Sequence, residues 1–155
     1  MSDPKIVAEL RAAALDSINR GFSILICEPR EKNPWTKYSE HAVNSASNDP
    51  AVALRPWDEG QDANYGVACG RSNLTVVDVD KGIPNETALK NWMTAIGLPE
   101  TFTIRTGRDG EAGFHLYYSG AVKTTPYQIE GVVGELRSNG AYVVGPNSIH
   151  PIIQK

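Results

Sequence analysis

The chain has 155 residues, a net charge of −3, 41% hydrophobic residues and 21% charged residues. This length fits one domain, and the composition is that of an ordinary soluble globular protein. No apolar run approaches the ~20 residues of a membrane span, and the N-terminus lacks a basic segment followed by an apolar one, so we predict no membrane helix or signal peptide. The charge argues against a global DNA-binding surface and leaves two alternatives, a local basic cleft or one module of a larger assembly.

The two cysteines, Cys27 and Cys69, both lie in apolar, strand-like runs. We expect buried free thiols in a reducing cytoplasm, with a disulfide as the minor alternative. The chain has no Cys-x-x-Cys pair, so no zinc is expected.

Apolar spacing predicts the elements of the N-terminal third. Helical spacing over Lys5–Arg20, followed by Gly21, predicts a packing helix. Phe22–Cys27 follows as a buried strand. Asp49 and Pro50 are typical of a helix cap and first turn, and predict a short helix that ends at about Trp57.

The rest of the chain is rich in strand patterns. Two hairpins are predicted: Tyr65–Cys69 with Leu74–Asp80, and Val132–Arg137 with Ala141–Gly145 across an Asn-Gly turn. Between them lie a helix over Glu86–Ile96, alternating strands over 101–106 and 114–118, and a loop carrying Gly107, Gly110 and Gly113. That loop is either an anion-binding backbone or a plain hairpin tip. The order predicts an α+β fold with an antiparallel-rich mixed sheet and packed helices.

The strand Leu74–Asp80 ends in two acids separated by one residue. Because side chains on a strand alternate between its faces, Asp78 and Asp80 point the same way, roughly 6 to 7 Å apart, while Val77 and Val79 point into a core. Adjacent carboxylates repel each other unless a cation lies between them, and such oxygen ligands suit Mg²⁺ or Mn²⁺. The plainer alternative is two acids that face water at a strand end.

Three further polar side chains, those of His115, Glu135 and Arg137, lie on later strands that alternate between faces in the same way. His115 alternates with Phe114 and Leu116, and Glu135 shares a face with Arg137. A lone histidine is usually a packing residue, and the Glu-x-Arg pair also fits a cross-strand ion pair on a solvated face. Taken with Asp78 and Asp80, however, the set is what two-metal phosphoryl or nucleotidyl transfer needs.

The ordered motifs resemble the N-terminal bifunctional primase/polymerase (prim-pol) domain of the archaeo-eukaryotic primase superfamily. The resemblance spans about Gly21 to Pro151. It includes two departures: Gly113 stands where the family often has Ser, and Glu135 where Asp is common. The matching segments are Gly21-Phe22 with Lys32 and Pro34, Asp62–Gly70, Val76–Asp80, Thr106-Gly107 through His115–Tyr118, and Glu135–Ser148 with His150-Pro151.

The resemblance implies a role for each matching residue. Asp78, Asp80 and Glu135 would be the catalytic acids that bind two Mg²⁺ or Mn²⁺ ions. His115, Arg105, Arg137 and Lys32 would bind the nucleotide triphosphate. The implied partners are (d)NTPs, a single-stranded or primed DNA template, and a helicase domain or protein. A single prim-pol catalytic domain over 1–155 is expected, either excised from a longer replication protein or a compact stand-alone version.

Three functions remain open on the sequence. The leading one is a template-dependent nucleotidyltransferase, a DNA primase or polymerase or both. The second is a nucleotide- or nucleic-acid-binding module without turnover, recruited to a helicase-type replication protein, which the acidic net charge favours. The third is a metal-dependent phosphodiesterase or nuclease that uses the same acids.

Overall fold

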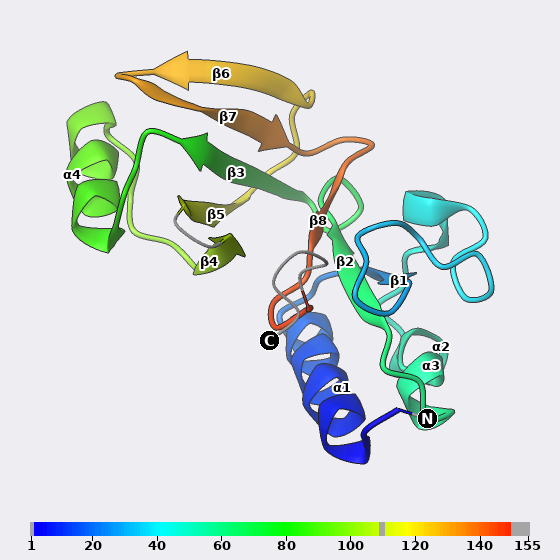
Figure 1. Ribbon diagram of the computed structural model, residues 1–155. Coiled ribbons are helices and arrows are strands. Elements are labelled where there is room, and N and C mark those ends of the chain that lie inside the picture. The colour runs from blue at the N-terminus through cyan, green and yellow to red at the C-terminus, as the bar shows by residue number, and fades with distance from the viewer. Residues whose placement is uncertain (1, 109–110, 150–155) are drawn as a thin grey trace.

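The computed structural model describes residues 2–108 and 111–149 (Figure 1). The chain has the α+β fold that the sequence predicts, with most helices in the N-terminal half and a run of strands in the C-terminal half. In order they are α1 (Pro4–Asn19), β1 (Ile24–Cys27), the 3₁₀ helix η1 (Ala42–Ser45), α2 (Pro50–Ala53), α3 (Arg55–Asp58), β2 (Asn64–Ala68), β3 (Leu74–Lys81), α4 (Glu86–Ile96), β4 (Thr103–Arg108), β5 (Glu111–Ser119), β6 (Thr125–Ile129), β7 (Val132–Arg137) and β8 (Tyr142–Val144).

The strands form two antiparallel sheets. One has the order β1-β2-β8 and the other the order β4-β5-β3-β7-β6. Both predicted hairpins are therefore wrong in their pairing, because β2 and β3 lie in different sheets, as do β7 and β8. The strands themselves are present close to their predicted bounds.

The chain crosses between the sheets twice, and the two crossings are bonded to each other. Residues 69–73 lead from β2 to β3, and residues 138–141 lead from β7 to β8. The Gly70 amide donates to the Ser138 carbonyl at 3.0 Å, and the Cys69 amide donates to the Ala141 carbonyl at 3.0 Å. A side chain at Gly70 would meet the Asn139 backbone, so the close contact requires glycine there. The predicted turns are real, but they join sheets rather than neighbouring strands.

The hairpin that the sequence analysis did not find is β6–β7. Its turn consists of Glu130 and Gly131, both with positive φ (50° and 77°), as a tight hairpin turn requires. β6 is an edge strand, mostly exposed, and contains Pro126. Proline and a polar, solvent-facing sequence weaken the strand signal, which is why β6 gave no clear pattern.

The helix caps have the predicted chemistry, but one predicted helix is interrupted. Asp49 accepts a hydrogen bond from the Ala51 amide and opens α2, but the predicted helix to Trp57 is divided into α2 and α3 at Leu54. Pro56 has no N–H to continue the hydrogen-bond ladder of α2, so the first helix stops. α4 begins at an Asn85 cap and ends at Gly97, which has φ 82°.

Two large buried clusters hold the sheets and helices together, and a third, small cluster of Leu25, Cys27 and Ala68 belongs to the three-stranded sheet. The first joins α1, α2 and α3 to the three-stranded sheet and to one end of β3, through Leu74 and Val76. The second packs α4 against the opposite face of the five-stranded sheet, where Val77 and Val79 are buried as predicted. Figure 1 shows α4 beside the five-stranded sheet and α1 to α3 beside the smaller one. One face of β3 thus runs from an apolar core to the two acids.

Three smaller expectations can be checked. Cys27 and Cys69 are buried free thiols. Gly107 and Gly113 lie in strands, so the glycine-rich loop is shorter than predicted; Gly110, like His150 and Pro151, lies outside the described residues. Among residues 2–108 and 111–149, no helix has both the length and the apolar character that a membrane crossing requires.

The crossing generates a stability prediction at Ser138, which is fully buried. Its Oγ accepts from the Val122 amide at 2.9 Å and donates to the Leu74 carbonyl at 2.8 Å. Ser138→Ala should lower the free energy of unfolding by about 1–3 kcal/mol in urea titrations, because it leaves the Val122 amide and the Leu74 carbonyl without a hydrogen-bond partner. The exposed Ser119→Ala is the matched control, and an equal effect of the two changes would contradict this account.

Candidate functional site

The centre of the site is a row of three side chains on adjacent strands. In the register of the sheet, Asp78 on β3 lies opposite His115 on β5 and opposite Glu135 on β7. Directly opposed residues of antiparallel strands have Cβ atoms ~5 Å apart and share a face of the sheet. The fold therefore brings together, on one face, three of the residues singled out from the sequence.

Each carboxylate oxygen of Asp78 contacts a basic side chain. His115 Nε2 lies 3.4 Å from its Oδ1, and Arg137 Nε lies 3.2 Å from its Oδ2. Its side chain is only 12% exposed. Burial alone raises the pKa of Asp78, but the hydrogen bond and charge of His115, and then those of Arg137, lower it below its ordinary value. Asp78 is thus kept as a carboxylate in a nearly buried position.

Arg137 joins the second acid of the row to the first. Its Nε also lies 3.2 Å from Glu135 Oε1, and one terminal nitrogen donates to the Tyr142 carbonyl at 3.3 Å. The ion pair that the sequence analysis weighed as an alternative therefore exists, and it includes Asp78 as well as Glu135.

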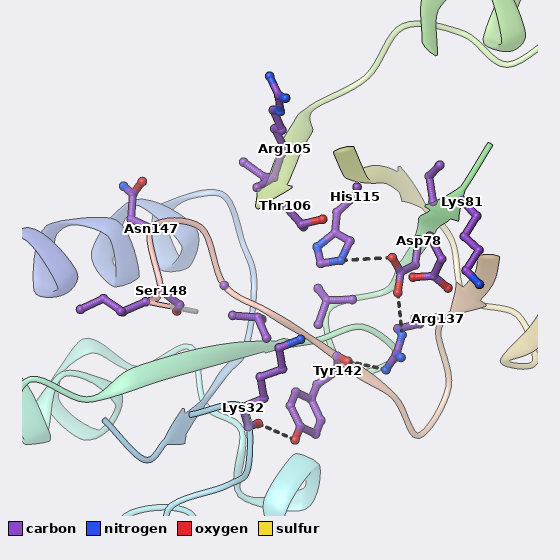
Figure 2. A pocket seen from close by; sticks show the side chains of 18 residues that line it. Lys32, Asp78, Lys81, Arg105, Thr106, His115, Arg137, Tyr142, Asn147 and Ser148 are labelled. Atoms are coloured by element: carbon purple, nitrogen blue, oxygen red, sulfur yellow. Dashed lines mark hydrogen bonds and ion pairs between the residues drawn. The ribbon is translucent and has the colours of Figure 1, made fainter. Parts of the chain in front are cut away.

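A cavity of about 610 Å³ opens beside this row, between the five-stranded sheet and the segment that follows β8. The volume lies within the ~300–1,000 Å³ of small-molecule sites. Asp78, Asp80 and His115 line it from one sheet, and Lys32 and Ser148 from the other side (Figure 2). Residues that belong to both sheets therefore make one site.

Asp80 and Lys81 stand at the strand end beside the row. Asp80 is exposed and lines the same cavity as Asp78. The register between β3 and β7 shifts between Val79 and Lys81, and Figure 2 shows the Lys81 side chain on the cavity wall near Asp78. Bulges of this kind re-aim side chains next to functional sites. Lys81 was not singled out from the sequence, because strand alternation alone would put it on the face opposite Asp80.

The two remaining predicted cations differ in position. Lys32 lines the cavity from the loop after β1, and its carbonyl accepts a hydrogen bond from the Tyr142 hydroxyl at 2.8 Å. Arg105 is on β4 opposite Phe114, and Figure 2 shows its guanidinium directed away from Asp78 and His115. Lys32, Lys81 and Arg137 thus bring positive charge to this cavity, in a chain whose net charge is negative.

One ring atom of the buried His115 has no partner. Its Nδ1 makes no hydrogen bond within the described part of the chain, although the residue is only 7% exposed. Buried polar atoms are nearly always satisfied, so a partner from outside the chain, either a water molecule or a ligand group, is expected at this atom.

The segment Asp62–Gly70 has a structural role that sequence reasoning did not assign. Asp62 forms an ion pair with Arg30 at 2.9 Å, and the buried Asn64 donates to the carbonyls of Glu31 and Ile149. Asn64 also accepts from the Ile149 amide at 2.8 Å. The motif therefore fastens two cavity walls, the Lys32 loop and the segment after β8, to the central strand of the small sheet.

Carboxylates that suit a divalent ion are present but not gathered. Among residues 2–108 and 111–149, no three His, Cys, Asp or Glu side chains are arranged to hold a metal ion. The contacts of Arg137 with Asp78 and Glu135 supply a physical reason, because the guanidinium takes the place between the two acids.

Comparison with known families supplies the assignment. The family model for the bifunctional DNA primase/polymerase N-terminal domain (Prim-Pol) matches residues 14–154. The chain belongs to this family. No curated protein matches the chain in a sequence search. The prim-pol family is one of DNA primase/polymerase-type nucleotidyltransferases, so the domain is a primase-type module whose ligands are nucleotides and DNA. The resemblance drawn from the ordered motifs is confirmed.

The hydrogen bonds of Asn64 to Glu31 and Ile149, called here the Asn64 clamp, generate a prediction about the prim-pol cavity walls. Asn64→Ala would leave the Ile149 amide and two carbonyls without partners, so it should lower the free energy of unfolding by about 2–3 kcal/mol and speed hydrogen exchange at Ile149. The exposed Asn44→Ala is the control. Unchanged exchange at Ile149 would contradict the clamp.

Proposed function

We propose that this domain is a template-dependent nucleotidyltransferase, a DNA primase/polymerase that joins (d)NTPs to a 3′-hydroxyl with the help of two divalent metal ions. The observation that carries the proposal is the row of His115, Asp78 and Glu135 across three strands, beside a cavity that also presents Asp80 and several cations. Family membership supports the reaction class.

The acids of the row and the neighbouring Asp80 fit hard divalent cations. Asp78, Asp80 and Glu135 offer carboxylate oxygens, which Mg²⁺ and Mn²⁺ prefer, and Asp78 is already a carboxylate in the nearly buried site. In our proposal these three residues would hold the ions. When bound, such a pair of ions makes a hydroxyl more acidic and stabilises a leaving pyrophosphate.

The cations of the chain would orient the nucleotide. Lys32, Lys81 and Arg137 bring positive charge to the walls and would bind the triphosphate. An imidazolium at His115 has two N–H donors, so it can keep its bond to Asp78 and donate from Nδ1 to a phosphate oxygen. Arg105 lines the same cavity with its guanidinium directed away from Asp78 and His115, so it would contact a part of the nucleotide that lies farther from these two residues.

The bond changes of the proposed reaction define what these residues must position. The 3′-hydroxyl oxygen of a primer or initiating nucleotide forms a bond to the α-phosphorus, and the bond from that phosphorus to the oxygen bridging to the β-phosphate breaks. The hydroxyl proton passes to solvent water, and pyrophosphate leaves with the electrons of the broken bond. Binding that aligns these atoms accounts for much of the catalysis in such transfers.

One assay separates this proposal from the two alternatives. The protein is incubated with Mn²⁺ or Mg²⁺, labelled nucleotide and either a primed or an unprimed single-stranded template. Extension or primer synthesis supports nucleotidyl transfer. Shortening of the template or primer strand on a stained gel would indicate a phosphodiesterase. Nucleotide binding without turnover would indicate a binding module. Either result without extension would reject the proposal.

The acids generate the first functional prediction. Asp78→Asn and Asp80→Asn keep the side-chain shape but remove the charge, so each should lower primer extension by about 100-fold or more while circular dichroism shows an intact fold. Glu100→Ala, an exposed acid outside the cavity, is the control and should retain activity. Unchanged primer extension by both Asp variants would contradict the proposed mechanism.

The cations generate the second functional prediction. His115→Ala and Lys81→Gln should each raise the nucleotide concentration needed for half-maximal extension by about tenfold, since each removes one contact to a charged phosphate. The metal dependence should be preserved. Lys90→Gln, on the exposed face of α4, is the control, and an equal shift in that variant would argue against specific contacts.

A further inference from the structure

The guanidinium of Arg137 occupies a position that matters for the metal site. A single atom, Nε, lies 3.2 Å from Asp78 Oδ2 and 3.2 Å from Glu135 Oε1. The other oxygen of Asp78 faces His115. The two carboxylates that would share a divalent ion therefore already share a cation that belongs to the chain.

Electrostatics makes the two cations alternatives to each other. A divalent ion between Asp78 and Glu135 would lie within a few Å of the guanidinium, and like charges at that distance in a partly buried site repel strongly. The guanidinium also fills the space between the two carboxylates, where an ion that bridges them would lie. Entry of a bridging ion therefore requires that Arg137 move.

We propose that Arg137 is an internal counter-ion that holds Asp78 and Glu135 in place in the metal-free domain and is displaced when a divalent ion binds. The proposal rests on the proposed function for the identity of the ion. It accounts for the presence of three suitable acids on one face that are not gathered as a metal cluster among the described residues.

The surroundings of Arg137 allow this movement without unfolding. Its side chain is 39% exposed and that of Glu135 is 36% exposed, whereas Asp78 is nearly buried. Because the Arg137 side chain is partly exposed, it can change rotamer while its strand stays fixed, and it then gives up its hydrogen bond to the Tyr142 carbonyl. A displaced guanidinium would lie in the cavity, where a triphosphate would bind it. Metal and nucleotide would then favour each other's binding through Arg137.

The test is the affinity of the nucleotide-free protein for Mn²⁺, measured by the electron paramagnetic resonance signal of free Mn²⁺ and by calorimetry. Arg137→Gln should bind Mn²⁺ at least about tenfold more tightly than the natural chain, and its melting temperature should be lower in EDTA but rise more on adding Mn²⁺. Arg71→Gln, an exposed arginine outside the cavity, makes the same net change in charge and should leave the affinity unchanged.

A second variant controls for the misfolding of Arg137→Gln. Arg137→Lys keeps the positive charge but lacks the Nε that contacts both acids, so its Mn²⁺ affinity should fall between those of the natural chain and Arg137→Gln. An affinity that is unchanged or weaker in both Arg137 variants, or equal to that of Arg71→Gln, overturns the proposal.

The outcome is separable from that of the proposed function. If the natural chain extends primers with Mn²⁺ but the Arg137 variants bind Mn²⁺ no more tightly, the counter-ion role fails and the enzyme activity stands. If no extension occurs but Arg137→Gln still binds Mn²⁺ more tightly, the counter-ion role stands and the activity fails. If no variant binds Mn²⁺ under any condition, the counter-ion role is overturned by that result alone.

Discussion

The site depends on keeping one nearly buried carboxylate charged. Asp78 lies in the central strand of a five-stranded sheet, with His115 at one oxygen and Arg137 at the other. An unpaired carboxylate in this position would take up a proton or cost several kcal/mol of folding free energy. Because its partners come from the two neighbouring strands, the charge of Asp78 and the register of β5, β3 and β7 stabilise each other.

The second requirement is that the chain pass between two sheets at one place. The crossings at 69–73 and 138–141 are bonded to each other, so β3 and β8 leave the junction in fixed directions. Beyond the junction the apolar face of β3 gives way to Asp78 and Asp80, and the segment after β8 forms the facing wall. Gly145 lies against the Tyr65 ring and Asn64 binds Ile149, so this wall is part of the packed structure.

The strand patterns were informative about each strand but not about its partners. Alternation placed Val77 and Val79 in a core, with His115 facing away from Phe114 and Leu116, and the structure agrees on all of these. The pairing of β2 with β3 was wrong because a short polar connection fits a hairpin and a crossing between sheets equally well. β6 was missed because an exposed edge strand has little apolar periodicity. Lys81 was missed because a bulge overrides alternation.

The sequence by itself determined the fold class and the family, because apolar period, turn residues and ordered motifs are local properties of a chain. Only the tertiary structure decided that His115, Asp78 and Glu135 form one row, that Asn64 holds the cavity walls, and that Arg137 lies between two acids. Those facts depend on strand register and on contacts between residues far apart in the chain, and local patterns do not encode such contacts.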